Sequence, residues 1–140
     1  MSFNVSKVKG SIPVARSNGF DVLAVGSDGQ MLVADSTTVT GLRWGSAFEK
    51  VRAVAASGAI LATDDVLLGT AGAGGITLTL PAPATNANHI FTIKKVDAAA
   101  GFVTVAQNAA ETIDGAASVN LISQYQAISV ISDGTNWFII

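Results

Sequence analysis

Histidine is the side chain that most often exchanges a proton near neutral pH, and the chain has one, His89. No nucleophile motif accompanies it, because the sequence has no cysteine, no Gly-x-Ser-x-Gly turn and no His-Glu-x-x-His helix. His89 comes directly before the apolar stretch 90–93, where a structural or an exposed role is expected. The sequence therefore predicts that the protein is not an enzyme and has no catalytic residues.

Two other segments contain residue types that bind ligands in other proteins. Residues 69–75 are rich in glycine, but they lack the Lys-Ser/Thr ending of a phosphate-binding loop and lead into a strand, so we expect a flexible hairpin loop. Asp64 and Asp65 could offer oxygens to calcium, but neighbouring side chains on a strand point to opposite faces. We therefore expect a turn between residues 59–63 and 66–68, no metal site and no cofactor.

Trp44, Tyr125 and Trp137 are the aromatic residues that could stack on a sugar or a base. Aromatic residues make up only 6% of the chain, and these three do not cluster with bases or amides in the sequence. We expect Trp137 to lie in the core. A carbohydrate-binding module that exposes Trp44 and Trp137 is the alternative from a different functional class.

The elements that carry these residues are best defined near the C-terminus. Turns are predicted at Asp114-Gly115 and Asp133-Gly134, because Asp-Gly pairs adopt positive φ at little cost and join strands. The last residues, 137–140, read Trp-Phe-Ile-Ile. Such an end must be buried, either in its own sheet or against another copy of the chain.

The second half of the chain reads as short strands between turns. Alternation in 76–80 places Ile76, Leu78 and Leu80 on one side and threonines on the other, and Pro81 then stops the strand. The predicted strands are 59–63, 66–68, 76–80, 89–96, 102–106, 118–122, 127–131 and 136–140. This pattern predicts an all-β domain over residues 57–140, a compact antiparallel β-sandwich or barrel, jelly-roll-like.

The first part of the chain, residues 1–56, is broken more often by glycines and polar turns. Residues 20–25 and 30–34 read as a β-hairpin, and 40–45 as a further short strand. Residues 47–56 fit a helix that begins after Ser46, or equally a strand over 51–55, because Val51 and Val54 are β-branched. We place the boundary between the two regions near Ser57-Gly58.

Composition excludes several partners. Charged residues make up 13% of the 140 residues and hydrophobic residues 49%, yet no apolar run approaches the ~20 residues of a membrane helix. Residues 1–7 lack the apolar core of a signal peptide, and no base follows Lys95, which argues against nucleic acid. Residues 1–57 carry six bases and four acids, a net charge of +2, and 58–140 carry two bases and six acids, a net of −4. This imbalance could favour head-to-tail contacts or docking on an acidic shell.

Several segments together resemble a small β-domain of tailed bacteriophages. They are Leu-Pro at 80–81, Phe-Thr-Ile-Lys-Lys at 91–95, Thr-Val at 104–105, Glu-Thr-Ile-Asp-Gly-Ala at 111–116 and Ser-Asp-Gly-Thr-Asn-Trp at 132–137. This domain recurs in virion surface proteins: tail fibres, head fibres and capsid decoration proteins. Residues 25–32 and 41–44 also resemble a module found near the attachment ends of phage fibre proteins.

The resemblance implies a homotrimeric virion structural protein, made in the host bacterial cytoplasm and located on the virion surface. Residues 1–56 would attach the protein to the major capsid protein or another virion protein, and 57–140 would form the exposed domain. Because the chain leaves no room for a large tip, a capsid decoration (cement) or head-fibre protein is favoured. A short tail fibre or baseplate component that contacts a host surface glycan remains the alternative within this class.

Overall fold

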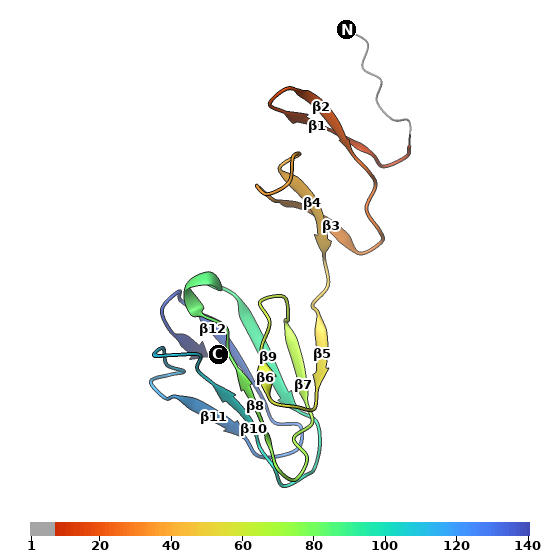
Figure 1. Cartoon of the computed structure of the whole chain (residues 1–140). Coiled ribbons are helices and arrows are strands. Elements are labelled where there is room, and N and C mark those ends of the chain that lie inside the picture. Colours follow the sequence, from red (N-terminus) through yellow and green to blue (C-terminus); the bar gives the residue numbers. More distant parts are fainter. Residues whose placement is uncertain (1–7) are drawn as a thin grey trace. The chain divides into compact units, whose positions relative to one another are not determined.

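The computed structural model describes residues 8–140, and in this range it is all-β with no α-helix (Figure 1). Residues 1–7, on which the prediction of a missing signal peptide rests, lie outside the described range. The chain divides into two compact units, Met1–Phe48 and Glu49–Ile140. Four small sheets form these units, and each unit is described in turn below.

The first unit consists of two separate antiparallel hairpins. One pairs β1 (Ile12–Arg16) with β2 (Gly19–Leu23), and the other pairs β3 (Gln30–Ala34) with β4 (Leu42–Ser46). The predicted hairpin over residues 20–34 is therefore wrong, although both of its strands exist. A two-residue turn that ends at Gly19, where φ is 137°, already pairs β2 with β1. The residue range 12–16 was not predicted as a strand.

Trp44 explains why the segment after β2 does not fold back as a hairpin. Its indole Nε1 donates a hydrogen bond of 2.7 Å to the carbonyl of Ala24. Its ring lies so close to Gly26 that a Cβ there would come within 2.6 Å of it. Only glycine fits this approach, so the segment 24–26 is held against β4 rather than turning directly between β2 and β3.

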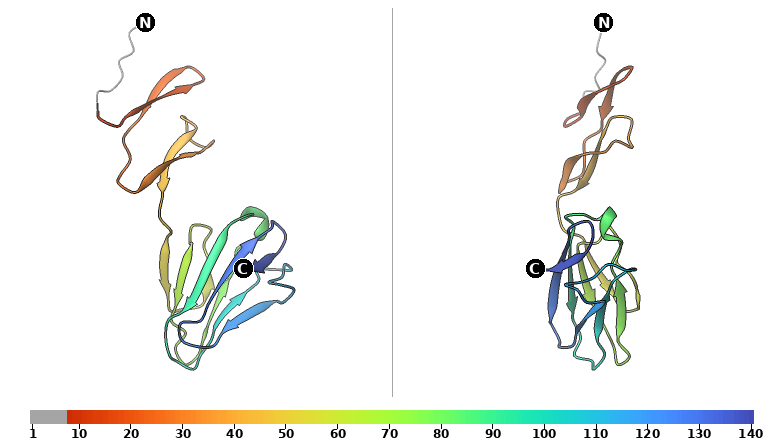
Figure 2. Two further views of the ribbon diagram at one scale, coloured as in Figure 1. Left: turned by 180° about the vertical axis from the view of Figure 1, so that it is seen from behind. Right: turned by 90° about the vertical axis from the view of Figure 1, so that its left-hand side faces the viewer.

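The second unit consists of two sheets that lie face to face (Figure 2). The five-stranded sheet contains, in spatial order, β13 (Trp137–Ile139), β12 (Ala127–Ser132), β9 (Ile90–Lys95), β7 (Val66–Gly69) and β5 (Val51–Val54). The four-stranded sheet contains β11 (Ser118–Leu121), β10 (Val103–Ala106), β8 (Ile76–Thr79) and β6 (Gly58–Ala59). A single 3₁₀ turn among the described residues, η1 (Pro83–Thr85), lies between β8 and β9.

From β5 to β10 the chain changes sheet after every strand. As a result β5, β7 and β9 are parallel neighbours in one sheet, and β6, β8 and β10 are parallel neighbours in the other. Antiparallel pairing is confined to the last strands, β10 with β11, β12 with β9 and β12 with β13. The predicted antiparallel, jelly-roll-like pairing is thus wrong over the first half of this unit, and the sheets do not close into a barrel.

Inward-facing side chains from both sheets form one core. Phe91 of the five-stranded sheet packs against Trp137 with ring centroids 5.4 Å apart, and both are fully buried. The predicted alternation is confirmed: Ile76, Leu78 and Leu80 are buried, whereas Thr77 and Thr79 lie on the outer face. The other fully or nearly fully buried apolar residues are Ile60, Leu67, Ala71, Ile93, Val103, Val105, Ile113, Leu121 and Val130.

The other strand predictions are confirmed except for residues 59–63, and the boundary between the two regions also differs from the predicted one. Residues 47–56 contain β5 and no helix, so the strand alternative is confirmed there. The predicted strand 59–63 is wrong, because β6 ends at Ala59 and a turn closes with the amide of Asp64 bonded to the carbonyl of Leu61. Since β5 pairs with β7, it belongs to the second unit, and the division of the chain falls between Phe48 and Glu49 rather than near Ser57.

The C-terminal strand is held in its own sheet but is not wholly buried. The side chain of Trp137 is inaccessible, while Phe138 is 41% exposed and Ile140 66% exposed. The outer edge of β13 is covered by residues 112–114, since the amide of Trp137 bonds to the carbonyl of Thr112. The sheet therefore satisfies the backbone of this segment and leaves part of its apolar surface uncovered.

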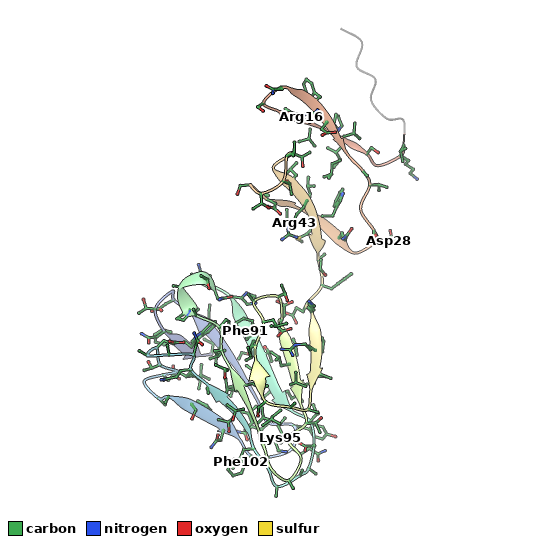
Figure 3. The ribbon with its side chains drawn as sticks, viewed as in Figure 1. Arg16, Asp28, Arg43, Phe91, Lys95 and Phe102 are labelled. Carbon is green, nitrogen blue, oxygen red and sulfur yellow. The ribbon has the colours of Figure 1, made fainter. Side chains whose placement is uncertain are left out.

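The two phenylalanines Phe91 and Phe102, labelled in Figure 3, provide a matched test of this core. We expect Phe91→Ala to lower the free energy of unfolding by about 3–5 kcal/mol, because truncating a fully buried phenylalanine leaves a cavity. Phe102 is 45% exposed, so Phe102→Ala should change it by less than about 1 kcal/mol. Urea unfolding followed by far-ultraviolet circular dichroism measures both, and equal effects would contradict this core.

Candidate functional site

The second unit has a shallow depression of about 340 Å³ around His89. The imidazole stacks on the ring of Phe91, with centroids 4.2 Å apart, and its Nε2 lies 3.1 Å from the carbonyl oxygen of Asp64. The hydroxyl of Thr92, which also lines the depression, is bonded to the hydroxyl of Ser129 at 2.9 Å. Glu49, Asp65, Val66, Asn88 and Ile90 complete the lining. Stacking and the contact to a backbone carbonyl give His89 a structural role.

Asp64 is fully buried and forms a bidentate ion pair with Arg52. Arg52 Nε lies 2.9 Å from Asp64 Oδ1 and Nη2 lies 2.6 Å from Oδ2. Burial acts to raise the pKa of Asp64, but the hydrogen bonds from Arg52 and from the amide of Leu61 outweigh it and hold the pKa below its ordinary value. The pair closes the margin of the core beside β5, where Arg52 occupies an inward-facing position.

The carboxylate of Asp65 has different partners from that of Asp64. Its Oδ2 accepts a hydrogen bond of 2.6 Å from the amide of Lys50, and its Oδ1 lies 3.5 Å from His89 Nε2. The two acids therefore do not converge on a common point. In the described part of the chain no group of three or more His, Cys, Asp or Glu residues is placed to hold a metal ion.

Lys95 is a second charged group at the margin of the core. Its side chain is fully buried, and its ammonium donates to the carbonyl oxygen and to the carboxylate of Asp97. The Lys95 hydrogen bond, together with the amide of Gly72, lowers the pKa of Asp97 to about 2. The sequence contained a signal for this burial, because Phe91, Ile93 and Lys95 share one face of a strand by alternation.

The same carboxylate fixes the glycine-rich stretch 69–75. Asp97 Oδ2 accepts from the amide of Gly72 at 2.8 Å, and a Cβ on Gly101 would come within 2.3 Å of the Gly75 nitrogen. The stretch connects β7 in one sheet to β8 in the other, so the predicted hairpin is wrong there. Within the stretch, Gly75 packs closely against the backbone of Phe102, and its φ of 76° also favours glycine.

The aromatic residues do not form a common binding surface. Trp137 is buried in the core, as expected, and Trp44 is half-buried with its indole nitrogen bonded to Ala24. Tyr125 is 63% exposed, and the ammonium of Lys94 lies 5.7 Å from the centre of its ring. Trp44 and Trp137 belong to different units of the chain.

Residues 8–48, by contrast with the second unit, contain no buried apolar side chain. Each hairpin has one surface ion pair, Arg16 with Asp21 at 3.4 Å and Arg43 with Asp35 at 3.0 Å. Exposed apolar residues of this part include Val8, Val25, Met31, Leu32, Val39 and Phe48. A two-stranded hairpin without a buried face is at best marginally stable in water. The described part of this unit therefore derives little stability from apolar burial.

Comparison with known proteins adds no family to these observations: no family model matches the chain, and no curated protein sequence is significantly similar to it. In the described residues no helix is long and apolar enough to cross a membrane.

The short contact between Lys95 and Asp97 predicts an acid-sensitive element of stability. The pKa of Asp97 falls from an ordinary value of 3.8 to about 2 on folding, so the contribution is fully present above pH 3.8 and is lost as the pH falls through about 2. We therefore expect Asp97→Asn to lower the melting temperature at neutral pH. The difference from the unmodified chain should shrink as the pH is lowered towards 2.

Thermal unfolding of both chains across this pH range, followed by circular dichroism, measures the difference. Asp28→Asn is the matched control, since the exposed Asp28 side chain forms no hydrogen bond or ion pair within the described residues. A difference between the Asp97→Asn variant and the unmodified chain that is independent of pH would contradict the assignment.

Proposed function

We propose that the protein is a bacteriophage virion structural protein, a homotrimeric capsid decoration (cement) or head-fibre protein. In this proposal residues 8–48 belong to the part that assembles and docks, and residues 49–140 are displayed on the particle. The observation that carries the proposal is the contrast between the two units: the second has a complete core, and the described part of the first has none.

The chemistry of the first unit favours other copies of the chain as its partner. Its two ion pairs, Arg16–Asp21 and Arg43–Asp35, each bring together one base and one acid, so hairpins from different copies can approach without net repulsion. Another copy is also present at equal concentration from synthesis onward. The three-fold symmetry and the virion come from the resemblance of residues 25–32, 41–44 and the second unit to phage proteins.

The resemblance to phage proteins also supplies the proposed docking partner and location. The docking partner is the major capsid protein or another virion protein, and the location is the virion surface after synthesis in the host cytoplasm. Neither nucleic acid nor a membrane is a partner. A short tail-fibre or baseplate component that contacts a host surface glycan is the alternative. A free-standing carbohydrate-binding module is less favoured, because Trp137 is buried and the indole nitrogen of Trp44 is already bonded.

Self-association is tested by light scattering behind a sizing column. We expect a mass of about three times 14.2 kDa for the unmodified chain. The double variant Met31→Asp/Leu32→Asp should run as a monomer, because it places charge on both faces of β3. The matched control is Val39→Asp, which adds a charge to an exposed turn and should keep the mass of the unmodified chain. A monomeric unmodified chain would overturn the proposed self-association.

The position on the particle is tested by electron microscopy of virions labelled with gold-conjugated antibodies against the chain. Label distributed over the head is expected for a decoration or head-fibre protein. Label confined to the tail tip would establish the alternative, and unlabelled virions would reject both. Antibodies against the exposed loop residues 122–126 suit this experiment, because that loop lies at the surface of the second unit.

A further inference from the structure

The two outer faces of the second unit differ in chemistry. The outer face of the five-stranded sheet, called the apolar face below, is defined by Val51, Val66, Leu68, Ile90, Ile131 and Phe138. All six are at least partly exposed, and Val51 reaches 59%. Contiguous apolar surface of this kind in a single chain indicates an interaction site.

Strand register makes the apolar face continuous. Ile131 lies directly opposite Ile90 on one side and Phe138 on the other, so the three side chains form a row across β9, β12 and β13. Val51 lies opposite Val66 at the other edge of the sheet. The side chains of directly opposed residues lie within contact distance on the same face of a sheet.

The two hydroxyl groups in the middle of this face are hydrogen-bonded to each other. Val66 lies opposite Thr92, and Thr92 lies opposite Ser129. The two hydroxyls are bonded at 2.9 Å. A partner can therefore cover the middle of the face without leaving a buried hydroxyl unpaired, which would otherwise cost free energy.

The centre of the outer face of the four-stranded sheet is polar. Its central row consists of Thr77, Thr104 and Asn120, and the hydroxyl of Thr104 donates to the Asn120 side chain at 2.8 Å. Such hydroxyl and amide groups are well solvated where they are exposed. Two apolar residues, Phe102 and Ile122, are 45% and 57% exposed at one end of this sheet, just beyond β10 and β11. The five-stranded sheet therefore carries the larger set of outward apolar side chains.

We propose that the apolar face is the surface by which the second units of neighbouring copies contact each other in the assembly. This proposal rests on the proposed self-association. The charges near the face favour a second copy, since Lys94 lies beside Leu68 in one row, while Glu49 and Asp65 line the depression next to Ile90. Around a three-fold axis, the end of the patch that carries the base in one copy can meet the end that carries the acids in the next copy.

The order of elements along the chain also supports a second copy as the partner of the apolar face. β5, which carries Val51, begins immediately after the first unit ends at Phe48. If the first units hold copies together, a short connection keeps neighbouring β5 strands at high effective concentration. Contact along the apolar face then requires little additional affinity.

The chain has no cysteine, so a single introduced thiol reports burial without interference. Ile90→Cys and Val51→Cys place a thiol at either end of the apolar face, and Thr77→Cys places the control thiol on the hydroxyl-bearing face. Alkylation by N-ethylmaleimide is followed by mass spectrometry on the full-length chain. Light scattering on the same samples gives the mass.

We expect a trimer in which the thiols at 90 and 51 react about tenfold or more slowly than the thiol at 77, because reaction requires the interface to open. After denaturation all three should react alike. If a variant at 90 or 51 lowers the mass while Thr77→Cys does not, that also supports the apolar face as the contact.

The failures of the two proposals are distinguishable. A trimer whose thiols at 90 and 51 react as fast as the thiol at 77 would overturn the proposed contact and leave the self-association intact. A monomeric control chain with equal reactivity at all three positions would overturn both.

Discussion

The packing of one sheet on the other in residues 49–140 is the interaction on which the rest of this unit depends. The strands β5, β7, β8, β9 and β10 place alternate side chains inward, while the chain crosses between the sheets after each strand from β5 to β10. Phe91 and Trp137 pack against each other between the layers, and the removal of the whole set of core side chains from water is the main favourable contribution to folding. The crossing path makes neighbours of strands that are distant in sequence.

Charged residues complete this core at two of its margins. Arg52 and Lys95 occupy positions that alternation directs inward, and each is matched by one acid, Asp64 or Asp97. Buried charges are tolerated only where a partner of opposite sign and further hydrogen bonds compensate for lost hydration. The Asp97 carboxylate also fixes the glycine-rich crossing through the amide of Gly72, so one ion pair joins strand packing to loop geometry.

The described part of the first unit, in contrast, has hydrogen-bonded hairpins but no apolar core. Its hairpins satisfy their backbone hydrogen bonds, and Trp44 holds the segment between them, yet residues 8–48 bury no apolar side chain. This difference in core packing agrees with the proposed roles, in which the first unit assembles and docks and the second unit is displayed. The second unit also exposes apolar side chains on the outer face of its five-stranded sheet.

Several features of the fold could be predicted from the sequence alone. The alternation of Ile76, Leu78 and Leu80 with threonines, and the positive φ required at Asp114-Gly115 (48° and 83°), could be predicted because both depend on near neighbours in the chain. The burial of Trp137 followed from its apolar surroundings. These local rules fix the class of the fold and the face on which each side chain lies.

The tertiary structure alone decided which strands pair. Alternation indicates that Thr92 faces outward, but it does not state that β7 lies parallel to β9 or that β2 pairs with β1 instead of β3. Nor could spacing show that Lys95 meets Asp97 over the Gly72 loop, or that Ile90, Ile131 and Phe138 form one row. Strand pairing depends on the packing of the whole core, and that packing consists of contacts between residues far apart in the sequence. The sequence by itself therefore determined most of the strands, although not β1 or the extent of β6, and the packed core determined which strands pair.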